Sequence, residues 1–382
     1  ISPMSVASPI YLDYNATTPV DDRVLDAILP YFSRRFGNAA SRTHAYGWEA
    51  DEAVKLARKS VAGLLGCEPG ELVFTSGATE SINLGIKGAA AAYQSKGRHF
   101  ITCTTEHRAV LDVFEHLERD GAEVTRLPVQ PDGRLDPELL RSVLRNDTVL
   151  VAIMLANNES GVLQPIRELA ELTHERGALF FCDTTQAIGK LQVAVNELGI
   201  DLCTVSAHKY YGPKGVGALF VRRKNPRVTL VPQLDGGGHE HGLRSGTLNV
   251  PGIVGLGAAA ELVVRELWDD NQRISLLRSR LEQELITRCG AKVNGNTRHR
   301  LSNTTNLCFP GLRASELISA CPQLAISTGS ACSSALPEPS HVLRAMGLSE
   351  ADAYASIRIS LGRMTTEEEV RRAVGMIASS CQ

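Results

Sequence analysis

Short runs of apolar and β-branched residues alternate with helix-like segments through the first two thirds of the chain. Seven such runs occur, at residues 71–74, 99–103, 123–127, 149–154, 179–183, 202–205 and 217–221. Each run has the length of a strand, and the segments between most of them are long enough to contain a crossover helix. This pattern predicts an α/β fold with a mostly parallel, seven-stranded sheet covered by helices.

Helical periodicity flanks the predicted sheet on both sides. Val54, Ala57, Val61 and Leu64 recur at helical spacing and stop at Gly66, which is suited to end a helix in a left-handed conformation. After about residue 264, the stripe formed by residues 274, 277, 281 and 285 predicts a long amphipathic helix.

This change of pattern predicts a second, smaller α+β domain. We expect the large domain to span residues 18–264, and the small domain to combine residues 1–17 with residues 265–382. The last helix should open at Thr365 and Thr366, because hydroxyl side chains followed by three glutamates favour an N-terminal cap.

Length and charge restrict the possible partners. The chain has 382 residues and a formal net charge of -2, so it has no strong overall field to attract nucleic acid or an anionic membrane. The apolar run at residues 149–156 is far shorter than the ~20 residues that span a bilayer. The first residues show no basic segment followed by an apolar one. We therefore expect a cytoplasmic protein that acts on a small molecule.

The cysteines differ in their surroundings. There are nine, with no Cys-x-x-Cys pair, which argues against a disulfide framework and against a structural zinc site. Four lie in apolar runs and are expected to be small buried side chains: Cys103, Cys182, Cys203 and Cys308. Cys332 instead lies among Ser, Thr, Gly and Ala at residues 327–335, a composition that predicts an exposed loop with a reactive thiol.

Polar clusters follow five of the predicted strands, at residues 75–80, 106–107, 157–159, 183–186 and 206–209. In open α/β sheets, ligands bind beyond the carboxyl ends of the strands, so these clusters should converge on one crevice. A further polar and glycine-rich stretch at residues 236–247 predicts a functional loop rather than a linker.

Two of these clusters suggest pyridoxal phosphate. Lys209 follows a strand, where its amine could form a Schiff base, and Asp183 at the preceding strand end could pair with a protonated pyridine nitrogen. Gly77, Ala78 and Thr79 open a helix and could bind a phosphate, although the same turn could simply cap the helix. The segment matches neither the P-loop nor the dinucleotide-binding motif.

Two more residues have both a functional and a structural interpretation. His107 could stack on the cofactor ring and move protons, or it could be an ordinary core histidine. Arg358 lies in an apolar run, where its guanidinium needs a carboxylate, either that of an amino-acid substrate or that of a buried ion pair.

Taken together, the motifs resemble those of cysteine desulfurases of the NifS/IscS-like group, in the class-V aminotransferase family of fold-type-I enzymes. The resemblance rests on residues 11–19, 74–80, 105–107, 157–159, 206–215, 243–247 and 327–332 and covers nearly the whole chain. It implies a homodimer that uses pyridoxal 5'-phosphate to convert L-cysteine to L-alanine and leaves a persulfide on the enzyme. A protein acceptor would then take the sulfur for iron-sulfur clusters or for thio-modification of cofactors or nucleic acids.

The resemblance also implies residue roles. Lys209, His107 and Cys332 would be catalytic, with Lys209 holding the cofactor and Cys332 accepting sulfur. Asp183 would pair with the pyridine nitrogen, and Gln186 and Asn158 would lie near the phenolic oxygen. Arg358, together with Asn158, would bind the substrate. The phosphate would be held by Ala78, Thr79, Ser206 and His208, with Thr247 added from the neighbouring subunit.

Two departures and three alternatives accompany this interpretation. His241 stands where the family commonly has arginine, and the sequence stops soon after the last expected helix, where members of the IscS type carry an extension that docks a scaffold protein. A selenocysteine lyase has the same fold and cofactor, and the sequence does not separate it from a desulfurase. An aminotransferase would not need Cys332, and a non-enzymatic scaffold would not need the set formed by Lys209, Asp183 and His107.

Overall fold

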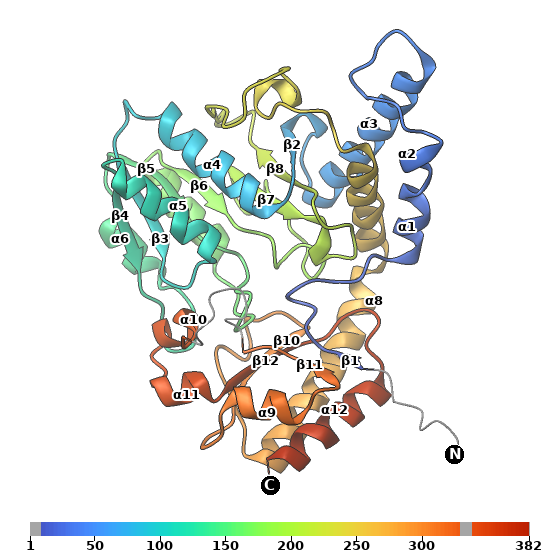
Figure 1. Cartoon of the computed structure of the whole chain (residues 1–382). Helices are drawn as coiled ribbons and strands as arrows, with labels where there is room; N and C mark the ends of the chain where they lie inside the picture. The colour runs from blue at the N-terminus through green and yellow to red at the C-terminus, as the bar shows by residue number, and fades with distance from the viewer. Residues whose placement is uncertain (1–8, 329–337, 382) are drawn as a thin grey trace.

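The computed structural model describes residues 9–328 and 338–381. Its large sheet has seven strands in the order β2-β8-β7-β6-β5-β3-β4, and β8 alone runs antiparallel to its neighbours. All seven predicted runs form strands: β2 (Leu72–Thr75), β3 (His99–Cys103), β4 (Glu123–Leu127), β5 (Thr148–Ala152), β6 (Leu179–Cys182), β7 (Leu202–Ser206) and β8 (Gly217–Val221). The mostly parallel sheet predicted from the sequence is confirmed (Figure 1).

Alternate residues of each strand face opposite sides of this sheet. On β2, for example, Leu72 and Phe74 belong to one hydrophobic core and Val73 to another. Both faces of the sheet are covered, so its central strands need nearly continuous apolar sequence. The helices of this lobe are α1 (Asp22–Ile28), α2 (Pro30–Ser33), α3 (Ala45–Leu65), α4 (Ala78–Ala92), α5 (Arg108–Arg119), α6 (Pro137–Val143) and α7 (Ile166–Glu175).

The smaller lobe contains two small sheets. One pairs β12 (Ser356–Ser360), β10 (Thr304–Cys308) and β9 (Lys292–Val293) as antiparallel strands, and the other pairs β1 (Ile10–Tyr11) with β11 (Leu324–Ala325) in parallel. Its helices are α9 (Ala314–Ala320), α10 (His341–Ala345), α11 (Glu350–Tyr354) and α12 (Glu367–Ser380). As predicted, Thr366 caps α12, in a capping box with Glu369. Ile10 and Leu12 pack in the core of this lobe, so the chain begins its described part here.

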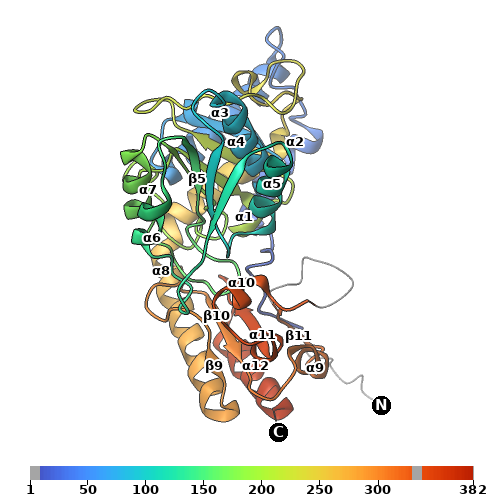
Figure 2. The same ribbon diagram turned by 90° about the vertical axis from the view of Figure 1, so that its left-hand side faces the viewer.

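Helix α8 (Val250–Cys289) joins the two lobes, running from one into the other in both views (Figures 1 and 2). Its first half packs in the core of the large lobe, and Ile274, Leu281 and Leu285 pack in that of the small lobe. The helix thus begins earlier than the change of pattern near residue 264 indicated. The proposed domain boundary at that residue falls inside α8 and stays a prediction.

Two further predictions concern the described residues. Cys103, Cys182, Cys203 and Cys308 are buried and unpaired, as expected. Within residues 9–328 and 338–381, no helix is long and apolar enough to cross a membrane.

Candidate functional site

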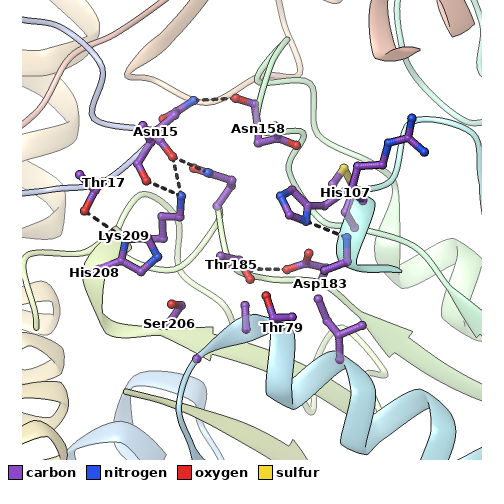
Figure 3. Close-up of a pocket in the computed structure, with 18 of the residues that line it drawn as sticks. Asn15, Thr17, Thr79, His107, Asn158, Asp183, Thr185, Ser206, His208 and Lys209 are labelled. Atoms are coloured by element: carbon purple, nitrogen blue, oxygen red, sulfur yellow. Dashed lines mark hydrogen bonds between the residues drawn. The ribbon is translucent and has the colours of Figure 1, made fainter. Parts of the chain in front are cut away.

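A cavity of about 800 Å³ lies beyond the carboxyl ends of the large sheet's strands. All five polar clusters predicted at strand ends contribute to its lining. Ten predicted site residues line it: Ala78, Thr79, His107, Asn158, Asp183, Gln186, Ser206, His208, Lys209 and Arg358. Figure 3 shows several of them pointing toward one another from different elements.

One end of the cavity is rich in hydrogen-bond donors. Helix α4 begins at Ala78, after Gly77 with a φ of +147°, a conformation nearly restricted to glycine. A methyl group at Gly77 would lie 3.7 Å from Ser206 Oγ, so the helix start and this hydroxyl face the same space. Free backbone N-H groups at a helix start, together with the Thr79 and Ser206 hydroxyls, fit a phosphate.

His208 adds an imidazole to this end. Its Nδ1 lies 3.1 Å from Thr17 Oγ1. Burial, reinforced by the charges of Lys209 and Lys214, lowers the pKa of His208 to about 4. The ring is therefore neutral at neutral pH and could donate one hydrogen bond to an anion.

The Lys209 amine lies in the middle of the cavity. Its Nζ donates to the backbone oxygens of Asn15 at 2.7 Å and Ala16 at 2.8 Å. These carbonyls belong to the chain segment after β1, which Figure 3 shows beside Lys209. These two hydrogen bonds hold the amine inside the cavity.

Asp183 presents a carboxylate from the end of β6. Its Oδ1 accepts hydrogen bonds from Thr185 N and Thr204 Oγ1, both at 2.9 Å, and its side chain is buried. Nearby Glu106 is also fully buried, and burial with the charge of Asp183 raises its pKa well above the usual value. Burial therefore disfavours the charged form of Glu106 beside Asp183.

His107 caps α5, and its Nδ1 accepts a hydrogen bond from Ala109 N at 3.1 Å. Burial is the main cause that lowers its pKa, and the charge of Lys209 acts in the same direction. A neutral ring that accepts at Nδ1 carries its proton on Nε2. His107 therefore combines the structural and functional interpretations, since it caps a helix and also lines the cavity.

Arg358 reaches the cavity from β12. Its Nη2 lies 2.6 Å from Asp13 Oδ1, and its Nη1 donates to Asn158 O at 2.9 Å. Both side chains are mostly buried, so water screens this ion pair only weakly. Arg358 thus lines the cavity while paired with a carboxylate of the protein itself.

One predicted residue is not brought to the cavity, and another cannot be placed. Thr247 lies in an exposed loop of this chain, away from the lining. Cys332 lies outside the described residues. The same loop as Thr247 is tied to the site indirectly, because Arg244 Nε donates to Glu80 Oε1 on α4 at 2.8 Å.

Several contributors were not predicted. Asn15, Thr17 and His341 line the cavity, and Asp13 pairs with Arg358. Asn15 and Thr17 lie in the motif at residues 11–19, which supported the family resemblance but indicated no chemical role for either residue. Their role depends on contacts across nearly 200 residues of sequence.

Comparisons with known proteins identify the family of this chain. The family model for class-V aminotransferases matches residues 10–373. A protein named cysteine desulfurase IscS from Anaeromyxobacter sp. (strain Fw109-5) is 57% identical over 375 residues, covering 97% of this chain and 91% of that protein. Another of that name from Rickettsia massiliae is 48% identical over 372 residues, covering 97% and 90%.

Solved structures with a similar fold carry related names. A structure titled NifS-like protein superposes with a TM-score of 0.91 at 38% identity and covers 97% of this chain and 98% of that one. A structure titled SspA in complex with cysteine has a TM-score of 0.82 at 37% identity, covering 94% and 100%.

Proposed function

This chain belongs to the class-V aminotransferase family, and on that premise we propose that it is a cysteine desulfurase that converts L-cysteine to L-alanine with pyridoxal phosphate. Identity of 57% to a desulfurase over nearly the full length supports this activity. The observation that carries the proposal is the meeting of the Lys209 amine, the Asp183 carboxylate and the start of α4 in one cavity.

The cavity fits pyridoxal phosphate in its donors and charges. The start of α4, with Ala78 and Thr79, and the side chains of Ser206 and His208 would hold the phosphate. Asp183 would face the pyridine nitrogen, and the neutral ring of His107 would stack on the cofactor. Gln186 and Asn158 would lie near the phenolic oxygen. When bound, this cofactor supplies an electron sink for negative charge at the substrate α-carbon.

The chain's own groups then bind substrate and move protons. Lys209 Nζ would hold the cofactor covalently and, when released from it, would move the proton of the substrate α-carbon. His107, a neutral ring whose Nδ1 accepts from Ala109 N, can donate a hydrogen bond through its protonated Nε2. Arg358 Nη1 and Nη2 offer the planar fork that a carboxylate requires, once Asp13 is displaced.

Cys332 completes the reaction. Its thiolate attacks the substrate sulfur, so a sulfur-sulfur bond forms as the carbon-sulfur bond breaks, and the carbon is protonated to give alanine. In sum, one thiol and one cysteine become one persulfide and one alanine. A protein acceptor would then take up this sulfur, and the relatives named IscS support a route to iron-sulfur clusters.

An exposed apolar surface supports the proposed homodimer. Helices α1, α2, α3 and α8 are neighbours, and these helices with the segments between them expose many large apolar side chains: Leu25, Leu29, Phe32, Phe36, Tyr46, Trp48, Leu56, Val264 and Trp268. Trp268 is 73% exposed and Phe32 is 64% exposed. Exposed large apolar side chains gathered on neighbouring elements favour a protein interface. Thr247 would then reach the cavity of the neighbouring subunit.

The proposal is tested with purified protein. We expect a yellow protein whose visible band requires Lys209, and equal amounts of alanine and sulfide from L-cysteine with a reductant present. Lys209→Ala should lose the band and nearly all turnover, whereas Lys214→Ala, at another lysine of the same lining, should keep the band. Turnover of L-selenocysteine alone would favour the lyase, and wild-type rates in Lys209→Ala would exclude the assigned role.

A further inference from the structure

A second lysine lies buried beside the cavity. Lys190 is 7% exposed, and its Nζ donates to Gln186 Oε1 at 3.0 Å and to Gln186 O at 3.1 Å. Among the described residues, no carboxylate forms an ion pair with it, and the charged groups that act on it, Lys209 and Arg358, are cations. Burial and these two charges lower the pKa of Lys190 to about 7.

A buried amine without an acid partner is costly for stability. A methionine of similar length would fill the same space without that cost. The usual structural reasons for a buried lysine, an ion pair or an exposed head group, are both missing at this described position. Its contacts with Gln186 therefore point to a role in the site.

Those contacts fix the direction of the Gln186 amide. Because Oε1 accepts from Lys190, the opposite end of the amide presents Nε2, which donates to Asn15 O at 2.9 Å. The same Asn15 oxygen accepts from Lys209 Nζ at 2.7 Å. A continuous set of hydrogen bonds thus joins Lys190, through Gln186 and Asn15, to the amine that would hold the cofactor.

We propose that Lys190 is a positioning residue that holds the Gln186 amide with its N-H donors facing the cavity, toward the phenolic oxygen of the cofactor. Without Lys190, only the hydrogen bond to Asn15 O would hold the amide in this orientation, and a rotated amide would present its oxygen to the phenolic oxygen and repel it. This inference rests on the proposed function, because it takes Gln186 as a cofactor contact.

The decisive variant is Lys190→Met, compared with Gln186→Ala, the double variant and Lys292→Met as a control at an exposed lysine. The affinity of the full-length, cofactor-stripped chain for pyridoxal phosphate is measured from the rise of the visible band. Each single variant at the site should weaken binding about tenfold, the size expected for one hydrogen bond to a charged partner. The double variant should be no weaker than the weaker single one, because the two residues act in series.

Thermal unfolding without cofactor separates positioning from a structural role. Lys190→Met should unfold at the same temperature as the wild type or higher, while its cofactor affinity falls. Unchanged affinity in Lys190→Met, additive losses of about a hundredfold in the double variant, or a lower unfolding temperature that parallels the lost affinity would each overturn the proposal. A wild type that binds no pyridoxal phosphate would overturn the proposed function itself.

Discussion

At the scale of single residues, the pairing of Arg358 with Asp13 limits how a substrate can bind. The guanidinium already has two partners, the Asp13 carboxylate and the Asn158 carbonyl. A substrate carboxylate that binds both Nη atoms must therefore replace Asp13, whose charge would then need contact with solvent. The side chain of Asp13 is 18% exposed, which leaves such a path.

We predict opposite effects from the two members of this pair. Arg358→Lys should raise KM for cysteine by about tenfold to a hundredfold with the cofactor still bound, because the planar fork is lost. Asp13→Asn should lower KM, since a neutral amide competes less for Arg358. Steady-state kinetics with the visible band as a control measure both. If Arg358→Lys unfolds and its folded fraction has normal kinetics, Arg358 is a structural residue.

His208 gives a prediction for pH. Its pKa falls from 6.5 to about 4 on folding, so between these values the unfolded chain binds the proton more readily. The contribution of His208 to the free energy of unfolding is therefore most favourable above about pH 6.5. It becomes less favourable as the pH falls toward 4. His208→Gln should therefore flatten this part of the profile by about 1 to 2 kcal/mol, allowing for partial exposure. Urea unfolding without cofactor at several pH values measures it, and parallel profiles would contradict the assignment.

Residue identity alone could predict Lys209 and Asp183, because each directly follows a strand of recognisable pattern. It could not predict that Asn15 and Ala16 supply the carbonyls around Lys209, since these atoms are backbone and any residue would offer them. Nor could it predict Asp13, whose partner is 345 positions away. Such contacts depend on how the segment after β1 crosses between the lobes.

At the scale of elements, the start of α4 is the part of the site most dependent on backbone shape. Gly77 has a φ that other residues rarely adopt, and a methyl group at Gly217 would lie 2.8 Å from Gly77 Cα. The strand end and the helix start are therefore packed backbone to backbone. That close approach leaves the first N-H groups of α4 facing the cavity.

Gly77→Ala should therefore weaken binding of pyridoxal phosphate by about tenfold to a hundredfold, because the strain of about 1 to 3 kcal/mol is relieved by moving the helix start. Gly63→Ala is the matched control, since Gly63 lies in α3 with open space around its Cα. Titration of each cofactor-stripped protein gives the affinities. Equal affinities in the two variants would mean that the start of α4 does not hold the phosphate.

Most elements were predictable because their patterns are local. Seven strands and the caps of α3 and α12 follow from residues adjacent in sequence. The first half of α8 was missed because it lacks an amphipathic stripe and contains Gly252, Gly255 and Gly257. Its packing explains the glycines, since a methyl group at Gly257 would lie 2.6 Å from Ala57 Cα on α3.

At the scale of the whole molecule, the proposed dimer depends on the exposed surface of α1, α2, α3 and α8. Phe32→Asp with Trp268→Asp places two charges on this surface without touching a core residue. We expect the wild type to have the mass of a dimer in analytical ultracentrifugation and the double variant that of a folded monomer. A wild-type monomer, or a variant dimer of unchanged stability, would contradict this interface.

Transfer of sulfur to Cys332 is the central claim, and mass spectrometry after brief exposure to L-cysteine without reductant tests it most directly. The wild type should gain one sulfur on the peptide that contains Cys332. Cys332→Ser should keep its colour yet release almost no alanine or sulfide, because a serine hydroxyl is not ionised near neutral pH and is a poor acceptor of sulfur. Desulfuration of cysteine by Cys332→Ser at the normal rate, or added sulfur only on another peptide, would contradict the account.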